Sequence, residues 1–522
     1  MTEMKDMQAR VDEYIRQFKV GYFSPLAMMA RLSEETGELA REINHHYGEK
    51  QKKSSEEQKA IAEELGDVLF VLITMANSLE IDLEEAFEQV MMKFEVRDYD
   101  RFERVDEQEG TGRSNGANKL TFTPLFRQAL PVLKQLTDHG YEAYFVGGSV
   151  RDALLGLEVN DIDIATSALP EEIKEIFPRT VDVGIDHGTV MVMVDGEAYE
   201  ITTFRTESTY QDFRRPDSVE FVRSLREDLQ RRDFTINAMA VDETGAIYDY
   251  YDGRADLEEG IIRAVGEADE RFNEDALRMM RAVRFSAQLG FDIEASTELA
   301  IKENASLLEH IAVERIHIEF VKLMCSQARA KGLKSMLKTK LFEYCPELAR
   351  NKLALMYLSN HEGDLQSEQQ AWSLLVHYMN FLMPTNYRVD IRQFLRQWKS
   401  SNQVIAAVEA IVSGIQKRQA TEIMDPFDIY QLGAELARDV EYLLTLIDGS
   451  GRPDKATAMH QSLQIKSQQE LAISGADIMK LTDQKPGPWL GDVLAQLVEE
   501  VVYGRLDNNE TILLAYVSEH LI

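Results

Sequence analysis

The chain has 522 residues, a net charge of −33, a hydrophobic fraction of 44% and two cysteines, which predicts several packed domains and excludes a disulfide framework. The N-terminus lacks the apolar run of a signal peptide and no stretch could span a membrane, so we expect a cytoplasmic protein. The negative charge is spread along the whole chain, so any binding of nucleic acid must come from local clusters of arginine and from the shape of the protein surface.

Residues 5 to about 104 predict an all-α domain, which we place at residues 1–105. Leucines recur there at helical spacing, and no strand pattern interrupts them. A polar run at residues 49–59 predicts a loop between two helices. The leucines that mark the helices are Leu32, Leu39, Leu65, Leu69 and Leu72.

Acidic residues cluster on both sides of this loop. On helices, Glu35 and Glu38 share one face, as do Glu64 and Asp67. Two facing helices could bring the four carboxylates together around Mg²⁺. Four like charges repel each other, so such a cluster needs either a bound cation or contact with solvent. The alternative is a pair of solvated helix faces, which are common.

With these paired acidic motifs, residues of about 20 to 100 resemble the MazG-like nucleotide pyrophosphohydrolases. The resemblance implies that the domain binds a nucleoside triphosphate through Mg²⁺, releases pyrophosphate by attack of water, and self-associates into a homo-oligomer. Lys93 and Arg97, one turn apart on the last predicted helix, would be phosphate contacts. The alternative is a domain that has kept the fold but serves only as a dimerisation or regulatory module.

A polar segment rich in Gly, Ser and Asn at residues 106–118 predicts a linker. Residues 119–265 then change in character to an α/β mixture, in which a helix over residues 124–137 precedes runs typical of strands. The dipeptide Asp195-Gly196 indicates a hairpin between two of them. The predicted strands cover residues 144–146, 162–165, 189–194, 199–204 and 247–250.

The most informative stretch begins where the first of these strands runs into Gly147 and Gly148. Glycines let a backbone approach phosphates, while Asp161 and Asp163 on the following strand would point to one face and hold Mg²⁺. The combination predicts a two-metal nucleotidyl-transfer site, with an ordinary turn and a solvated acidic strand as the alternative. Glu200, on a later strand, is either a third catalytic carboxylate or a solvated residue.

Two further motifs carry arginines. Arg231 and Arg232 stand beside Asp233, which suits triphosphate binding, although a surface salt bridge at a strand entry is the alternative. Further along, an aspartate and three arginines recur every three residues on a predicted helix. Such a stripe can present hydrogen-bond donors and acceptors to the edge of a nucleotide base. The alternative is a solvent-exposed helix face that carries ion pairs. The stripe consists of Asp275, Arg278, Arg281 and Arg284, and the core residues beside it are Leu277, Met280 and Phe285.

Together with the run 314–320, these motifs resemble the class II tRNA nucleotidyltransferases, the CCA-adding enzymes, within the polymerase β-like superfamily. The resemblance covers residues 119 to about 330 and implies addition of C, C and A to the 3′ end of tRNA from CTP and ATP, without a nucleic-acid template. It implies that Asp161 and Asp163 bind Mg²⁺, and that Asp275 and Arg278 act as the template for the incoming base. The other nucleotide-binding residues that it implies are Gly148, Arg151, Arg232, Arg281 and Arg284.

Residues 205–216 resemble the flexible loop of that family, and their full length favours complete CCA addition. Residues 266–330 would form a nucleotide-selecting helical neck, and the helical residues 331–522 a body and tail that bind tRNA. The predicted fold class is multidomain α+β: an all-α MazG-like bundle, a polymerase β-like α/β head, then an all-α neck, body and tail. A poly(A) polymerase with a non-catalytic N-terminal dimerisation module shares the core motifs and is the competing function.

Overall fold

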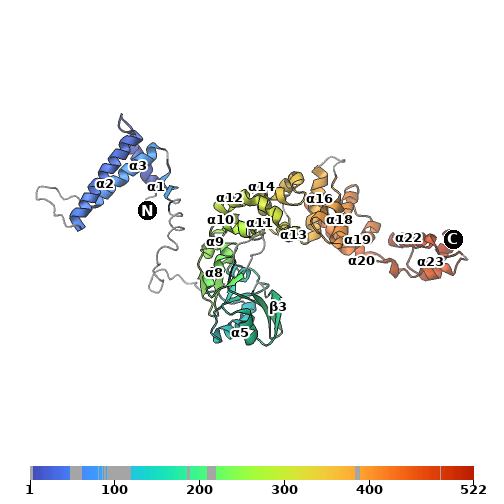
Figure 1. The fold of residues 1–522 in the computed structure, drawn as a ribbon. Coiled ribbons are helices and arrows are strands. Elements are labelled where there is room, and N and C mark those ends of the chain that lie inside the picture. Colours follow the sequence, from blue (N-terminus) through green and yellow to red (C-terminus); the bar gives the residue numbers. More distant parts are fainter. Residues whose placement is uncertain are drawn as a thin grey trace. The chain divides into compact units, whose positions relative to one another are not determined.

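The computed structural model describes residues 4–47, 61–79, 81–84, 86–87, 90, 119–184, 188–207, 219–361, 363–382, 388–482 and 484–521. The chain divides into two compact units, Met1–Asn115 and Gly116–Ile522 (Figure 1). Within the described ranges, no helix combines the length and the apolar character that a membrane span needs.

The N-terminal unit is built from helices in its described part. α2 (Pro25–Tyr47) begins at a proline, whose fixed φ suits the first turn of a helix, and lies alongside α3 (Ile61–Ser78) (Figure 1). α1 (Met4–Ile15) packs on α3, where the side chains of Gln8 and Asn77 are hydrogen-bonded at 2.9 Å. Asn77 Nδ2 also donates to the carbonyl of Gln8 at 2.8 Å, so these hydrogen bonds connect the middle of α1 to the C-terminal end of α3.

Several apolar side chains of this unit are exposed although their helical spacing marks an interior face. Leu65, Leu69 and Leu72 of α3 are 52%, 42% and 41% exposed. The buried apolar residues of the unit are fewer, and include Met28, Val71, Ile73 and Ala76. The described residues therefore cover only part of the apolar surface of this helix pair.

The second unit begins with α5 (Pro124–Asp138), whose buried face packs against a seven-stranded mixed sheet. The strand order is β3-β4-β5-β2-β1-β8-β9, and all neighbours are antiparallel except β2 and β5, which run parallel. The strands are β1 (Ala143–Val146), β2 (Asp163–Thr166), β3 (Thr180–Gly184), β4 (Thr189–Val194), β5 (Glu197–Thr203), β8 (Met239–Val241) and β9 (Ile247–Asp249). The predicted hairpin at Asp195 and Gly196 joins β4 to β5.

Short elements connect the strands of this sheet. Two small ribbons accompany it: β6 (Arg205–Glu207) with β7 (Val219–Phe221), and β10 (Ile261–Ile262) with β11 (Asp292–Ile293). The helical connections are α6 (Gly148–Leu154), α7 (Pro170–Ile176), α8 (Leu225–Gln230), η2 (Thr235–Asn237) and α9 (Gly253–Glu259).

From residue 268 onward, the described chain is almost entirely helical. The first group is α10 (Ala268–Glu274), α11 (Leu277–Leu289), α12 (Ala295–Asn304), η3 (Ala305–His310), α13 (Val313–Met324) and α14 (Arg329–Lys338). The second group is η4 (Leu341–Tyr344), η5 (Ala349–Asn351), α15 (Lys352–Leu358), α16 (Glu368–Leu382), α17 (Ile391–Gln397), α18 (Asn402–Gln419) and α19 (Pro426–Ile447). The last group is α20 (Pro453–Ser462), η7 (Gln468–Glu470), α21 (Gly475–Met479), α22 (Pro488–Val502) and α23 (Glu510–His520).

A continuous apolar core runs through the second unit, from Phe126 to Val517. Trp372 of α16 and Trp398 after α17 have ring centroids 4.9 Å apart, and Phe320 of α13 packs against both. The predicted fold class is confirmed, since helices precede and follow a mixed sheet in the order that the sequence predicted.

Candidate active site

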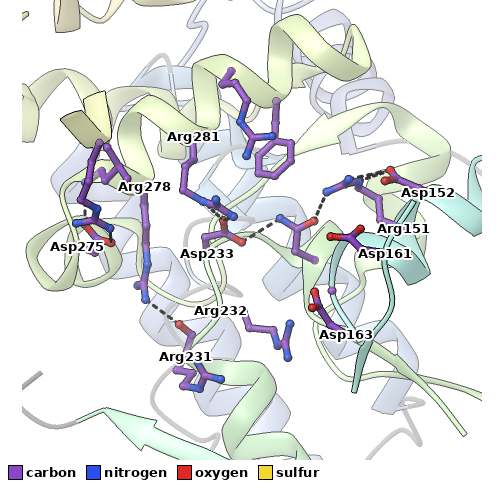
Figure 2. Close-up of a pocket in the computed structure, with 17 residues that line it drawn as sticks. Arg151, Asp152, Asp161, Asp163, Arg231, Arg232, Asp233, Asp275, Arg278 and Arg281 are labelled. Atoms are coloured by element: carbon purple, nitrogen blue, oxygen red, sulfur yellow. Dashed lines mark hydrogen bonds and ion pairs between the residues drawn. The ribbon is translucent and has the colours of Figure 1, made fainter. Parts of the chain in front are cut away.

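A cavity of about 470 Å³ in the second unit is lined by the start of α6, by the residues that precede η2, and by helix α11 (Figure 2). All seven predicted nucleotide-binding residues and both predicted metal-binding aspartates of this unit line it. Its charged lining residues are Arg151, Asp152, Asp161, Asp163, Arg231, Arg232, Asp233, Asp275, Arg278, Arg281, Arg284 and Arg315.

One edge of the cavity is a glycine turn between β1 and α6. Gly147 has a φ of +73°, in the left-handed region that favours glycine. A Cβ at this position would lie 3.2 Å from Nη1 of Arg232 and 3.6 Å from a carboxylate oxygen of Asp163. The glycine therefore keeps side-chain atoms out of the space between an arginine and a strand carboxylate.

Asp161 and Asp163 both line this space (Figure 2). Asp163 is the first residue of β2, opposite Val146, where β1 ends. The prediction that both aspartates lie on the strand is wrong for Asp161, because β2 begins only at Asp163. Burial and the Asp161 carboxylate raise the pKa of Asp163, against the opposing effect of the Arg232 guanidinium. Two carboxylates that disfavour each other's charge in this way favour a bound cation.

Glu200 lies beside this pair without lining the cavity. β5 runs parallel to β2 and places Glu200 opposite Asp163 in register. The Glu200 side chain is exposed, and its charge contributes to the raised pKa of Asp163. The structure thus brings the predicted third carboxylate close to Asp163 but outside the lining of the cavity.

A buried carboxylate orients the two arginines of the 231–232 pair. Asp228 is 1% exposed and accepts hydrogen bonds from Arg231 at 2.7 Å and from Arg232 at 3.1 Å. Although burial opposes ionisation, these two guanidiniums hold the pKa of Asp228 below its usual value. Asp228 was not among the predicted site residues.

A chain of hydrogen bonds crosses the cavity wall from α6 to α11 (Figure 2). Arg151 Nη1 donates to Asn237 Oδ1 at 2.6 Å, and Asn237 Nδ2 donates to Asp233 at 3.0 Å. Arg281 Nε donates to the other carboxylate oxygen of Asp233 at 2.7 Å. Burial opposes the charge of Asp233, but Arg281 and Asn237 hold the pKa of this carboxyl well below its usual range. The two arginines are therefore fixed through one ionised aspartate.

Asp275 does not lie on the helix that carries the arginines, so the predicted continuous stripe is wrong at its first member. Asp275 ends α10 in an extended conformation, and α11 begins at Leu277. The Asp275 carboxylate accepts from the Leu277 amide at 3.0 Å, which is the local bond by which aspartate competes with a helix. Arg315 of α13 also donates to both of its oxygens, at 2.7 and 3.3 Å.

Arg278 and Arg284 are buried, at 8% and 7% exposure, so the alternative of a solvent-exposed face is wrong for them. Arg278 Nη2 donates to the carbonyl of Arg231 at 2.9 Å. Arg284 donates to Glu319 and to Gln288, each at 2.7 Å, and its guanidinium lies 3.6 Å from the centroid of the Phe285 ring. The predicted core residues Leu277, Met280 and Phe285 are buried.

Arg315 and Glu319 are site residues that the sequence did not identify. They lie one turn apart on α13, within the run 314–320 that contributed to the resemblance. Their partners Asp275 and Arg284 are 40 and 35 residues away in the chain. Spacing within one helix carries no information about such pairs.

The N-terminal unit has a second acidic cluster. Ligand atoms of Glu35, Glu64 and Asp67 lie within 4.8 Å of one another, across α2 and α3. Glu64 is fully buried, and Arg31 lies 3.4 Å from Glu35. Glu38 is not part of this group and lies 3.5 Å from Arg41. Three of the four predicted carboxylates are therefore together, while the predicted phosphate contacts Lys93 and Arg97 lie outside the described residues.

A mixed sheet that presents two carboxylates beside a glycine turn, opposite a helix of arginines, defines the nucleotidyltransferase class. Residues 143–263 match the family model of the poly A polymerase head domain, and residues 290–352 that of a probable RNA and SrmB-binding site of polymerase A. Residues 364–517 match a putative tRNA nucleotidyltransferase domain 2. Residues 23–102 match the MazG nucleotide pyrophosphohydrolase domain.

Two curated relatives are CCA-adding enzymes. That of Enterococcus faecalis is 49% identical over 77% of this chain and 98% of its own length, and that of Latilactobacillus sakei is 51% identical over 76% and 98%. The crystal structure of the Bacillus stearothermophilus CCA-adding enzyme in complex with CTP matches with a TM-score of 0.70 at 42% identity, over 76% of this chain and 98% of that one. The chain therefore belongs to the family of CCA-adding enzymes and carries a MazG domain at its N-terminal side. Both predicted resemblances are confirmed.

Proposed function

We propose that this protein adds C, C and A to the 3′ end of tRNA, using CTP and ATP, and releases pyrophosphate at each step. The observation that carries the proposal is one cavity in which Asp161 and Asp163 lie opposite arginines. A nucleoside triphosphate requires both groups, since its phosphates need cationic donors and its transfer needs carboxylates that hold metal. A tRNA substrate would put the enzyme in the cytoplasm, as the sequence also predicted.

Asp161 and Asp163 are the residues that would hold Mg²⁺. The fit rests on the chemistry of the two side chains, because hard carboxylate oxygens suit Mg²⁺. Burial and the neighbouring Asp161 carboxylate raise the pKa of Asp163, and a bound cation would favour its ionised form. The chemistry that divalent ions supply at such a site is activation of the attacking hydroxyl and neutralisation of the leaving pyrophosphate. Glu200, beside Asp163 in register, would add negative charge next to this pair.

Asp275 and Arg278 are the residues that we assign to base selection. Cytosine and adenine both present an amino group next to an unprotonated ring nitrogen, whereas uracil and guanine present a carbonyl next to an N–H. A carboxylate that accepts from the amino group and a guanidinium that donates to the ring nitrogen therefore suit CTP and ATP alone. Both side chains are held in place by protein partners before any nucleotide binds.

The triphosphate would lie against Gly148 at the start of α6 and against Arg151, Arg232 and Arg281. Arg284 was predicted in the same role, but its guanidinium already donates to Glu319 and Gln288. We therefore assign Arg284 to bracing α11 against α13, with an indirect effect on nucleotide binding.

For the N-terminal unit we propose hydrolysis of nucleoside triphosphates to monophosphate and pyrophosphate. Glu35, Glu64 and Asp67 would hold Mg²⁺, since three carboxylate ligands lie within reach of one ion. Lys93 and Arg97 remain predicted phosphate contacts. The exposed leucines of α3 support self-association, because covering them would complete the apolar core of this helix pair.

Nucleotide selection tests this proposal directly. Purified protein, Mg²⁺ and a tRNA that lacks its 3′ terminus would be incubated with all four nucleoside triphosphates, and the new 3′ ends sequenced. The proposal predicts ends of C, CC and CCA. Tails of adenosine alone would support the competing poly(A) polymerase.

A further inference from the structure

One aromatic ring lies among three arginines of the cavity. Phe285 lines the cavity and is only 3% exposed. The centroid of its ring lies 3.6 Å from the guanidinium carbon of Arg284, 4.9 Å from that of Arg151 and 5.4 Å from that of Arg281. A guanidinium within about 6 Å of a ring centroid is attracted by the negative face of the ring. A single side chain is therefore within range of all three cations.

The ring lies where α6 and α11 meet. Phe285 and Arg281 are four residues apart on α11, which places them on one face of the helix. Arg151 belongs to α6. The same two arginines are joined through Asn237 and Asp233 by the chain of hydrogen bonds described above (Figure 2). The ring and the hydrogen-bond chain therefore act on one pair of guanidiniums.

The orientation of the ring is set by a second aromatic residue. Phe234 is fully buried, and its ring meets that of Phe285 edge to face, with centroids 5.8 Å apart and an interplanar angle of 85°. Edge-to-face packing is the arrangement that the charge distribution of two aromatic rings favours. This contact fixes the plane of the Phe285 ring and with it the direction of its negative face.

The cations of the cavity need such a neighbour because they repel one another. Seven arginines and five aspartates line the cavity. Burial and the charge of Arg281 lower the pKa of Arg284, against the opposing effect of Glu319. A further carboxylate would offset this repulsion, but it would also repel the phosphates of a nucleotide. An aromatic face attracts the guanidiniums without adding a formal negative charge.

We infer that Phe285 is a positioning residue for nucleotide transfer, whose ring holds the guanidiniums of Arg151 and Arg281 in place for the triphosphate. The inference rests on the proposed function, which assigns the phosphates to these two arginines. Arg284, at 3.6 Å from the centroid, is the third cation at the ring and braces α11 against α13. A leucine would fill the same core position but would not attract a cation, so Phe285 does more than the packing that its sequence pattern predicted.

The experiment varies the charge on the face of the ring while keeping its shape. Phe285 is replaced by phenylalanines that carry one, two or three fluorines, because fluorine is little larger than hydrogen but draws electrons away from the ring face. Equilibrium binding of CTP and of inorganic triphosphate is then measured on the full-length protein. A chelator is present, so that the N-terminal unit, whose proposed site needs Mg²⁺, does not contribute.

We expect the dissociation constants of both ligands to rise about twofold with each fluorine, and about tenfold in Phe285→Leu. The unfolding temperature should not fall along the fluorine series, since the packing of the ring is kept. The matched control is the same series at Phe177, which is 1% exposed in the apolar core of this unit. It should leave both dissociation constants unchanged.

Dissociation constants that do not depend on the number of fluorines would overturn the inference, as would an equal dependence at Phe177. A loss of affinity confined to CTP would also overturn it, because the ring would then act on the base and not through the arginines. An unaltered protein that binds both ligands but adds no cytidine to tRNA would contradict the proposed function, whereas the fluorine series would still decide the role of Phe285.

Discussion

The guanidinium of Arg315 donates to both carboxylate oxygens of Asp275, at 2.7 and 3.3 Å, across the break between α10 and α11. The Leu277 amide donates to the same carboxylate at 3.0 Å. Asp275 thus lies outside a helix yet has both oxygens fixed. A base-selecting carboxylate needs this restraint, because a rotating acceptor would tolerate more than one base edge.

Replacing Arg315 should therefore weaken nucleotide selection. Arg315→Lys keeps the charge but loses the second hydrogen bond to Asp275, so we expect KM for CTP and ATP to rise about tenfold, or about 1.4 kcal/mol. Misincorporation of UTP should rise as well, while KM for tRNA stays unchanged. Steady-state kinetics with each nucleotide checks this. Unaltered selectivity would show that Arg315 has no part in holding Asp275.

The aspartate pair should be essential for transfer but not for folding. Asp163→Asn removes one of the two carboxylates that we propose to hold Mg²⁺, and we expect CMP transfer to fall at least about a thousandfold, or about 4 kcal/mol of barrier. The same change relieves repulsion with Asp161, so the unfolding temperature of the metal-free protein should not fall. Transfer assays and thermal unfolding test the two parts separately. Retained transfer would refute the metal assignment.

The acidic cluster of the N-terminal unit should act independently of the nucleotidyltransferase site. Glu35→Gln removes one of the three clustered carboxylates and should abolish pyrophosphate release from free nucleoside triphosphates in the absence of RNA. Glu34→Gln, at an exposed neighbour on the same helix, is the matched control and should leave release intact. Extension of tRNA should be unchanged in both. Unchanged hydrolysis in Glu35→Gln would contradict the assignment.

Two histidines should make the stability of the second unit depend on pH. Burial lowers the pKa of His361 and of His377, and Nε2 of His361 lies 2.9 Å from the hydroxyl of Tyr378. The folded chain thus favours the neutral rings, so below the unfolded pKa of about 6.5 the unfolded chain binds more protons. The stability that depends on the neutral rings is fully present above that value and is lost as pH falls through the folded pKa.

Urea unfolding between about pH 5 and pH 7 measures this effect. We expect the free energy of unfolding to rise with pH across this range, and to rise less in His361→Gln/His377→Leu. His139→Gln, at an exposed histidine, is the control and should keep the rise of the unaltered protein. The same rise in all three proteins would assign the effect to other groups.

Local pattern was enough to locate the site. The strand runs, the glycine turn and the arginine spacing of α11 are all properties of contiguous sequence, and each places residues at the cavity. The error at Asp275 has a local cause that periodicity does not register, since spacing by three continues unchanged through a break between two helices.

The partners of these residues depend on tertiary structure and could not be predicted. Arg281 is paired with Asp233 and Arg284 with Glu319, over 48 and 35 residues of chain. The burial of Arg284 follows from packing against α13, which no spacing within α11 indicates. The exclusion of Glu38 from the acidic cluster could not be predicted for the same reason, since it depends on how α2 lies against α3.

We expect this cavity to transfer CMP to tRNA without a nucleic-acid template, and a single assay tests this most directly. Purified protein would be incubated with Mg²⁺, CTP as the sole nucleotide, and a tRNA that lacks its 3′ terminus. The structure predicts that cytidines are added and that Asp161→Asn, at a carboxylate that lines the cavity, abolishes their addition. Failure of the unaltered protein to add cytidine, or full activity of the variant, would contradict the account.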